Sequence, residues 1–207
     1  MFEKNPLGVI FAKIIMNDLI KQLREQTGAG ILEIKEALHE SGGDKDKAIE
    51  LLRKKGSLKA GKKADRIAKE GIVTSYIHPG GRVGVLVELN CETDFVARTE
   101  DFQNLAKELA LHIAGANPLY ISIADVPAEV IEKEKEIYKE EAKGKPAEVV
   151  NKMLEGKIAK FYEEVCLLEQ PFVKNPDLKV NDLLSHAVNK IGEKVQIRRF
   201  SRFVLGN

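Results

Sequence analysis

The sequence predicts an α+β fold in which helices pack a small antiparallel sheet. Two apolar, β-branched segments, 71–78 and 82–89, flank the turn Pro79-Gly80-Gly81, a pattern typical of a β-hairpin. Before and after this hairpin, apolar residues recur at the spacing of amphipathic helices. Two such segments within about 128–166 are separated by Gly144-Lys145-Pro146, which predicts a projecting antiparallel helical hairpin.

The composition excludes several classes of protein. The 207 residues, enough for one or two domains, include 33 basic and 32 acidic side chains and carry a net charge of +1. This balance argues against a dedicated nucleic-acid or membrane-surface binder, although local patches remain open. No apolar run approaches the ~20 residues of a membrane span. Cys91 and Cys166 lack disulfide-framework and metal-ligand patterns, so we expect reduced, buried thiols in a cytoplasmic protein.

Three short helices are expected between residues 16 and 56. Residues 27–30 (TGAG) end the first helix, because glycines adopt positive φ freely. Gly42-Gly43 ends the second helix, and Asp44 can cap the third. A bundle of this size is marginal alone and is expected to dock onto something else. Residues 1–15 precede it and are expected to be an unstructured extension.

A basic stretch follows the bundle. Lysines and arginines dominate residues 53–69, where the only acid is Asp65. Such a run can contact phosphates, which leaves open an RNA- or ribosome-binding module. A solvated linker or helix face is the commoner outcome. We assign residues 57–70 to a basic linker or helix and residues 71–207 to a core domain.

A third strand is expected at residues 194–205, near the end of the chain. Its apolar residues fall into two phases: Val195, Ile197, Phe203 and Leu205 alternate together, whereas Phe200 and Val204 do not. A β-bulge, or a sheet that is partly covered on both faces, would explain the mixture.

Residues 93–96 lie at the junction between the returning strand and a helix that we expect to continue through Leu105. Thr93 can cap this helix, and Asp94 suits the positive end of its dipole. Phe95 is a large apolar ring beside a carboxylate. In one interpretation Phe95 folds back onto the core and Asp94 only caps. In the other, Thr93, Asp94, Phe95 and Val96 form a wedge that is offered to a partner.

The sequence contains no recognisable catalytic constellation. Its histidines are scattered and lack plausible nucleophile partners: His39, His78, His112 and His186. Its carboxylates alternate with lysines on helix faces. We therefore expect that the protein is not an enzyme and has no metal site or cofactor of its own.

Three motifs resemble those of a known family. They are residues 23–38 (LREQTGAGILEIKEAL), 88–98 (ELNCETDFVAR) and 167–173 (LLEQPFV). Each is similar to a signature of translation elongation factor Ts, and the three occur in the family's order. The resemblance spans residues 16–207. It implies a three-helix domain of the ubiquitin-associated type, followed by a core domain with a coiled-coil projection.

The resemblance also implies a function and its residues. Members of this family act on elongation factor Tu as guanine nucleotide exchange factors, promoting GDP release in protein synthesis. Asp94 and Phe95 would enter between two helices of the Tu GTPase domain and displace groups that support its magnesium. Ile31 and Leu32, where the family commonly has methionines, would help dock the three-helix domain. His112 would contact the GTPase domain near its phosphate-binding loop.

The length of the chain implies an assembly. Long family members have two related core subdomains, and this chain has room for one, so it resembles the short members, in which a second copy supplies the missing half. A homodimer in a two-Tu, two-Ts assembly is expected, with an apolar patch on the sheet or its flanking helices. Neither a membrane nor a specific nucleic acid is expected as a partner. The alternative of RNA or ribosome binding would use residues 53–69 with Arg198, Arg199 and Arg202.

Overall fold

The computed structural model describes residues 6–141, 143–144 and 146–206, with side chains in these ranges from Met16 onward. It combines helices with a small antiparallel sheet, which confirms the predicted α+β class. The chain forms two compact units. One comprises the residues up to Ile67 together with Leu184–Lys194, and the other comprises Ala68–Leu183 and the residues from Val195 onward.

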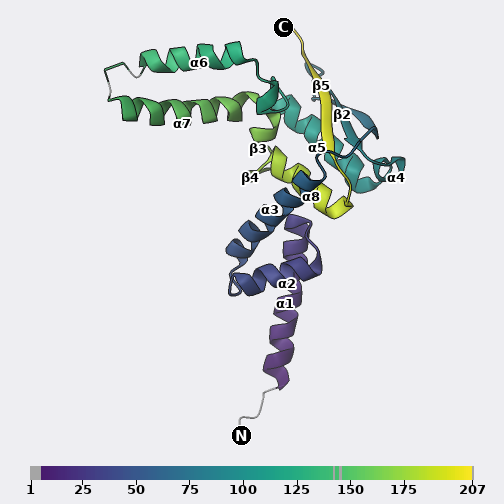
Figure 1. The fold of residues 1–207 in the computed structure, drawn as a ribbon. Coiled ribbons are helices and arrows are strands. Elements are labelled where there is room, and N and C mark those ends of the chain that lie inside the picture. Colours follow the sequence, from purple (N-terminus) through teal and green to yellow (C-terminus); the bar gives the residue numbers. More distant parts are fainter. Residues whose placement is uncertain (1–5, 142, 145, 207) are drawn as a thin grey trace. The chain divides into compact units, whose positions relative to one another are not determined.

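The N-terminal bundle consists of α1 (Pro6–Thr27), α2 (Ile31–Glu40) and α3 (Lys45–Lys62) (Figure 1). Their apolar faces meet in one cluster of buried side chains: Ile20, Leu23, Ala29, Ile34, Ala37, Leu38, Ala48 and Leu52. Asp44 caps α3 as expected, and its carboxylate accepts hydrogen bonds from the next two available N–H groups at 3.0 and 3.1 Å. The three-helix bundle is therefore confirmed.

Helix α1 begins at Pro6, whereas the sequence suggested an unstructured extension up to residue 15. For residues 6–15 that expectation was wrong, and residues 1–5 lie outside the described part of the chain. Proline is favoured in the first turn of a helix, where its fixed φ suits the helix and its missing N–H costs nothing. The sequence has no further proline before Thr27, so the helix can continue into the segment that packs Ile20 and Leu23.

The last part of α8 (Val180–Ile191) belongs to the same unit as the bundle. Gly28 approaches it so closely that a Cβ atom there would lie 2.7 Å from the His186 carbonyl oxygen. Gly28 also has φ of +65°, which favours glycine. A sequence-local reading could not show this contact, because the two partners are far apart along the chain.

The observed units differ from the predicted boundaries. Helix α3 continues through the first part of the expected linker to Lys62, and residues 184–194 complete the first unit instead of the core domain. Lys194 donates hydrogen bonds to the carbonyl oxygens of Ala64 and Arg66, at 2.6 and 2.9 Å. These contacts hold the segment after α3 to the C-terminal part of the chain.

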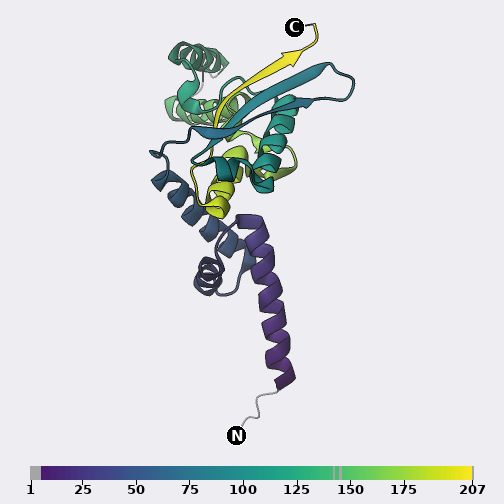
Figure 2. The ribbon, with the colours of Figure 1, turned by 90° about the vertical axis from the view of Figure 1, so that its right-hand side faces the viewer.

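A three-stranded antiparallel sheet in the order β1-β2-β5 organises the second unit. Its strands are β1 (Glu70–Ile77), β2 (Val83–Cys91) and β5 (Gln196–Val204), and α5 (Glu100–Ala116) packs against β1 and β2 (Figure 2). Large buried side chains from the sheet and from α5 include Val85, Val87, Leu89, Phe102, Leu109 and Ile113. Burial of each contributes about 1.5–3 kcal/mol, so this layer fixes the end of β2 firmly.

A bulge between β2 and β5 explains the mixed phase of the last strand. Glu88 pairs with Arg199 and Leu89 pairs with Ile197, so the ladder skips one residue of β5. An extra residue reverses the alternation of side chains between the two faces. Phe203 consequently falls on the face opposite Ile197, where it is exposed.

Helices α6 (Ala128–Glu141) and α7 (Ala147–Val165) lie side by side as the predicted helical hairpin (Figure 1). The core contains short elements that the sequence did not predict: η1 (Ile123–Asp125), η2 (Leu167–Glu169), β3 (Pro171–Phe172) and β4 (Asn175–Lys179). Elements of two to five residues are too short to produce a periodic pattern.

A membrane span would need a long apolar helix. Within the described ranges, no helix has the length and apolar character needed to cross a membrane.

Candidate partner-binding site

The candidate site is a single helical turn, α4 (Asp94–Ala97), that follows the end of β2. Thr93 is extended, and its hydroxyl oxygen accepts a hydrogen bond from the Val96 N–H at 3.4 Å. On the other side, Thr99 caps α5 by accepting from the Phe102 N–H at 3.4 Å, and its hydroxyl donates to the Val96 carbonyl at 2.8 Å. The turn is thus fixed at both ends.

This arrangement corrects the expectation of one helix running on from Thr93. Helix α4 ends at Ala97, and α5 starts separately at Glu100. The physical reason is Thr99, whose side chain caps the new helix and so favours a break there. The break leaves the α4 turn as a short projection.

The side chains of α4 point in different directions. Phe95 is 75% exposed, so the interpretation in which its ring packs onto the core does not hold. Val96 and Ala97 are buried and anchor the turn, so in this structure Val96 supports the tip instead of forming its surface. Asp94 lies beside the exposed ring and accepts a hydrogen bond from Arg98, Nη2 to Oδ2, at 2.7 Å. The tip therefore offers an apolar ring and a carboxylate together.

In the first unit, Ile31 and Leu32 form the first turn of α2 and are both exposed, Leu32 to 75%. The sequence left open whether they close the bundle, and their exposure shows that they do not. Glu33 follows them and is bound by Lys59, which lowers the pKa of its carboxyl group. The pair ties the start of α2 to α3 and holds the two aliphatic side chains on a defined surface.

His112 lies away from any surface, because its side chain is fully buried on α5. Its Nδ1 accepts from the Val173 N–H at 3.3 Å, and its Nε2 lies 3.0 Å from Oε1 of Gln170. The Gln170 amide nitrogen donates to the carbonyl oxygens of Ala116 and Glu164 at 3.3 and 2.8 Å. The expected direct contact of His112 with a partner does not fit this geometry. The residue instead joins α5 to the segment after α7.

His112→Gln is expected to lower the free energy of unfolding by about 1–3 kcal/mol at pH 8, because the Val173 N–H loses its acceptor. Burial lowers the pKa of His112 in the folded protein. Below the unfolded value of about 6.5 the unfolded chain then binds more protons, so the stabilisation is complete above that pH and is lost on acidification. Urea unfolding from pH 8 to 5 should show the gap between wild type and variant narrowing. Exposed His39→Gln is the matched control, and a gap that does not change with pH would contradict the assignment.

Comparison with known proteins identifies the family. The family model described as Elongation factor TS matches residues 11–207, and the match begins before the start at Met16 that the sequence suggested. The chain is 58% identical to Elongation factor Ts of Carboxydothermus hydrogenoformans over 195 residues, covering 93% of this chain and 90% of that protein. It is 55% identical to Elongation factor Ts of Thermotoga petrophila over 192 residues, covering 93% and 96%. This chain belongs to the elongation factor Ts family.

As a member of the elongation factor Ts family, the chain is a translation elongation factor. Its basic segment is largely occupied by internal contacts. Lys54 pairs with Glu50 at 2.8 Å and Lys55 pairs with Glu40 at 2.9 Å. Lys59 binds Glu33, and Lys63 donates to the carbonyl oxygen of Gly192. Four of the bases that the RNA-binding alternative requires thus have intramolecular partners.

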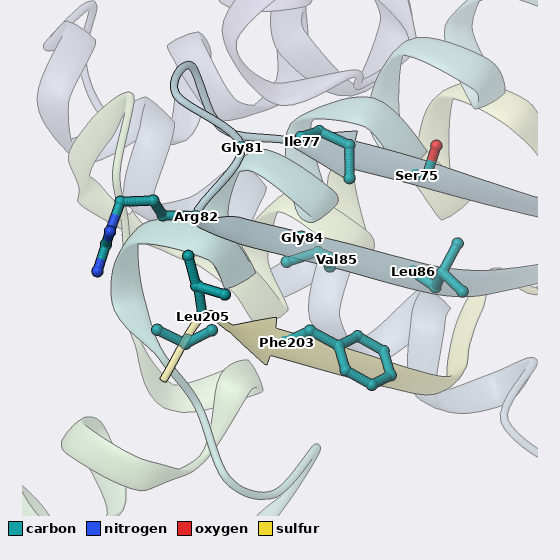
Figure 3. Close-up of a pocket in the computed structure, with 10 residues that line it drawn as sticks. Ser75, Ile77, Gly81, Arg82, Gly84, Val85, Leu86, Phe203 and Leu205 are labelled. Carbon is teal, nitrogen blue, oxygen red and sulfur yellow. The ribbon is translucent and has the colours of Figure 1, made fainter. Parts of the chain in front are cut away.

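The Ts-family chain also exposes an apolar face on its sheet, opposite α5. The large exposed side chains of this face and of the residue after β5 are Val73, Ile77, Leu86, Phe203 and Leu205. Figure 3 shows Ile77, Leu86 and Phe203 around a hollow with Gly84 at its floor, where the missing side chain leaves the space. Beside it, Glu88 and Arg199 form a cross-strand ion pair at 2.6 Å. The sequence foresaw an apolar patch in this region without locating it.

The chemistry available to the chain is that of binding surfaces. Burial raises the pKa of the Cys166 thiol to about 11, which keeps it protonated and a poor nucleophile at neutral pH. In the ranges that the structure describes, no group of three or more histidine, cysteine, aspartate or glutamate side chains is placed to hold a metal ion. The exposed features that could act on another molecule are the α4 tip, the start of α2 and the open face of the sheet.

Proposed function

We propose that this chain is a guanine nucleotide exchange factor that binds elongation factor Tu in the cytoplasm and promotes release of its GDP. The observation that carries the proposal is the α4 tip, where Phe95 is 75% exposed although its backbone is capped at both ends. A ring that is already ordered in the free protein loses little conformational freedom on binding. The tip is therefore suited to enter a partner as a preformed wedge.

Exchange of this kind requires no bond to be made or broken by the factor. A protein that binds nucleotide-free Tu more tightly than the GDP-bound form must weaken GDP by the same factor, because binding is reciprocal. Each 1.4 kcal/mol of this preference changes the affinity for GDP tenfold. We therefore infer that the chain acts by binding alone, without a cofactor or metal of its own.

One phenylalanine is too weak to do this by itself. Burial of its ring supplies about 1.5–3 kcal/mol, which corresponds to roughly ten- to a hundredfold in affinity. Asp94 is expected to add to this by disturbing the magnesium of the GTPase or its ligands. Ile31 and Leu32 supply an exposed aliphatic contact on the first unit, which fits a second docking point on Tu.

The assay that tests the proposal is release of fluorescent GDP from elongation factor Tu into an excess of unlabelled nucleotide. Catalytic amounts of the wild-type chain should accelerate release, with a rate that saturates as the concentration of Tu·GDP rises. Release at the spontaneous rate over the full concentration range would overturn the proposed function.

RNA or ribosome binding through residues 53–69 is the alternative. It predicts affinity for RNA that falls steeply with salt, because each neutralised phosphate releases a counterion. The ion pairs of Lys54, Lys55 and Lys59 oppose it, since those charges are already compensated. Titration of labelled RNA at 50 and 200 mM salt separates the two functions.

We further propose that the chain forms a homodimer through the open face of its sheet. An isologous interface places the same patch on both subunits, so the patch must be complementary to itself. This face meets the requirement, because its side chains are mainly apolar and the charges of Glu88 and Arg199 compensate each other. The dimer is consistent with a two-Tu, two-Ts assembly in which each copy has one core domain.

A further inference from the structure

The segment around the α4 tip is acidic and contains one basic side chain. Residues 92–101 include Arg98 and four acids: Glu92, Asp94, Glu100 and Asp101. Arg98 donates from Nη2 to Oδ2 of Asp94 at 2.7 Å, across the single turn of α4. The acid lies four residues before the base, which is the favourable orientation for such a pair on a helix.

This ion pair is not what holds the turn together. The backbone is fixed by the caps at Thr93 and Thr99 and by burial of Val96, as described above. The side chains of Arg98 and Asp94 are themselves 79% and 63% exposed. An exposed pair of this kind adds little to stability. What Arg98 does control is the direction and the net charge of the carboxylate beside Phe95.

We propose that Arg98 is a positioning residue for nucleotide exchange, which holds the Asp94 carboxylate over α4 until the tip docks. This inference rests on the proposed function. Without the guanidinium, the carboxylate samples its other rotamers, and ordering it again during docking costs free energy. The tip would also approach an anionic nucleotide with one more uncompensated negative charge, which slows encounter at low salt.

A double-mutant cycle in the GDP-release assay tests this role. Arg98→Ala alone should lower kcat/KM about two- to fivefold at low salt, the size of an exposed ion pair, and less at high salt. In an Asp94→Asn background the same substitution should have almost no effect, because the group through which Arg98 acts has been removed. Arg98→Lys keeps the charge and should retain most of the activity. An undiminished effect of Arg98→Ala in the Asp94→Asn background, or no effect in the wild type, would overturn the proposal.

Exposed Lys107→Ala on α5 is the matched control, because it removes the same charge from the same unit without touching Asp94. A loss equal to that of Arg98→Ala would reduce the effect to general electrostatics and overturn the specific role.

A second measurement needs no partner. NMR relaxation of the Arg98 guanidinium should show an ordered group in the wild type and a mobile one in Asp94→Asn. Equal mobility in both would remove the positioning role even where exchange is normal. Ordered Arg98 in a chain that fails to release GDP would instead remove the proposed function and leave the pairing intact.

Discussion

A Phe95→Ala variant is expected to promote GDP release from elongation factor Tu about 30-fold less efficiently than the wild-type chain. This factor corresponds to the ~2 kcal/mol typical of an anchoring residue at an interface. The free protein exposes 75% of the ring, so almost all the apolar area that the wedge buries would be gained on docking. Truncation to alanine removes that area and leaves the backbone of α4 unchanged, since its caps do not involve the ring.

The measurement is kcat/KM for fluorescent GDP release, together with the melting temperature of each variant. The melting temperature of Phe95→Ala should stay close to that of the wild type, because an exposed side chain contributes little to stability. Leu119→Ala, 63% exposed in the same unit and outside the α4 tip, is a matched control that should leave both values unchanged. Full activity of Phe95→Ala would remove the wedge role while leaving membership of the family untouched.

The parts of the site that the sequence predicted are those determined by near neighbours. Thr93 as a cap was readable because a cap depends on the next three residues, and Asp44 is confirmed for the same reason. The Asp94–Arg98 pair could also have been found from its four-residue spacing, but the sequence reading passed over it. Phe95 is different, because its local pattern allowed both a buried and an exposed ring. Its exposure follows from Thr99, which ends α4 and starts a new helix.

The features that the sequence did not predict depend on distant partners. His112 is buried because Gln170, 58 residues away, satisfies its ring nitrogen within the core. The phase of β5 depends on a bulge against β2, whose register is set by packing on α5. The length of α1 was missed for another reason: the family resemblance suggested a start at Met16, and Pro6 was not considered as the first residue of a helix.

Phe203→Glu is expected to convert a homodimer into a monomer. Phe203 lies on the open face of the sheet and is 68% exposed, so the monomer can accommodate the change without unfolding. In the dimer, however, the carboxylate would be buried against apolar side chains of the second copy, where no cation compensates it. Burial of an unpaired charge costs several kcal/mol, and 3 kcal/mol raises a dissociation constant more than a hundredfold. A dimer with a micromolar dissociation constant would therefore be lost at micromolar concentrations.

Light scattering of the wild type and of Phe203→Glu at matched concentrations measures this change directly. Phe203→Leu keeps an apolar side chain over the hollow beside Gly84 and should remain dimeric. Leu119→Glu introduces the same charge at a comparably exposed position of the same unit and should also remain dimeric. This pattern is specific, because a general effect of charge would dissociate both glutamate variants and a loss of folding would lower the melting temperature of Phe203→Glu. A wild-type chain that is monomeric at these concentrations, or a dimer that persists in Phe203→Glu, would exclude the sheet face as the interface.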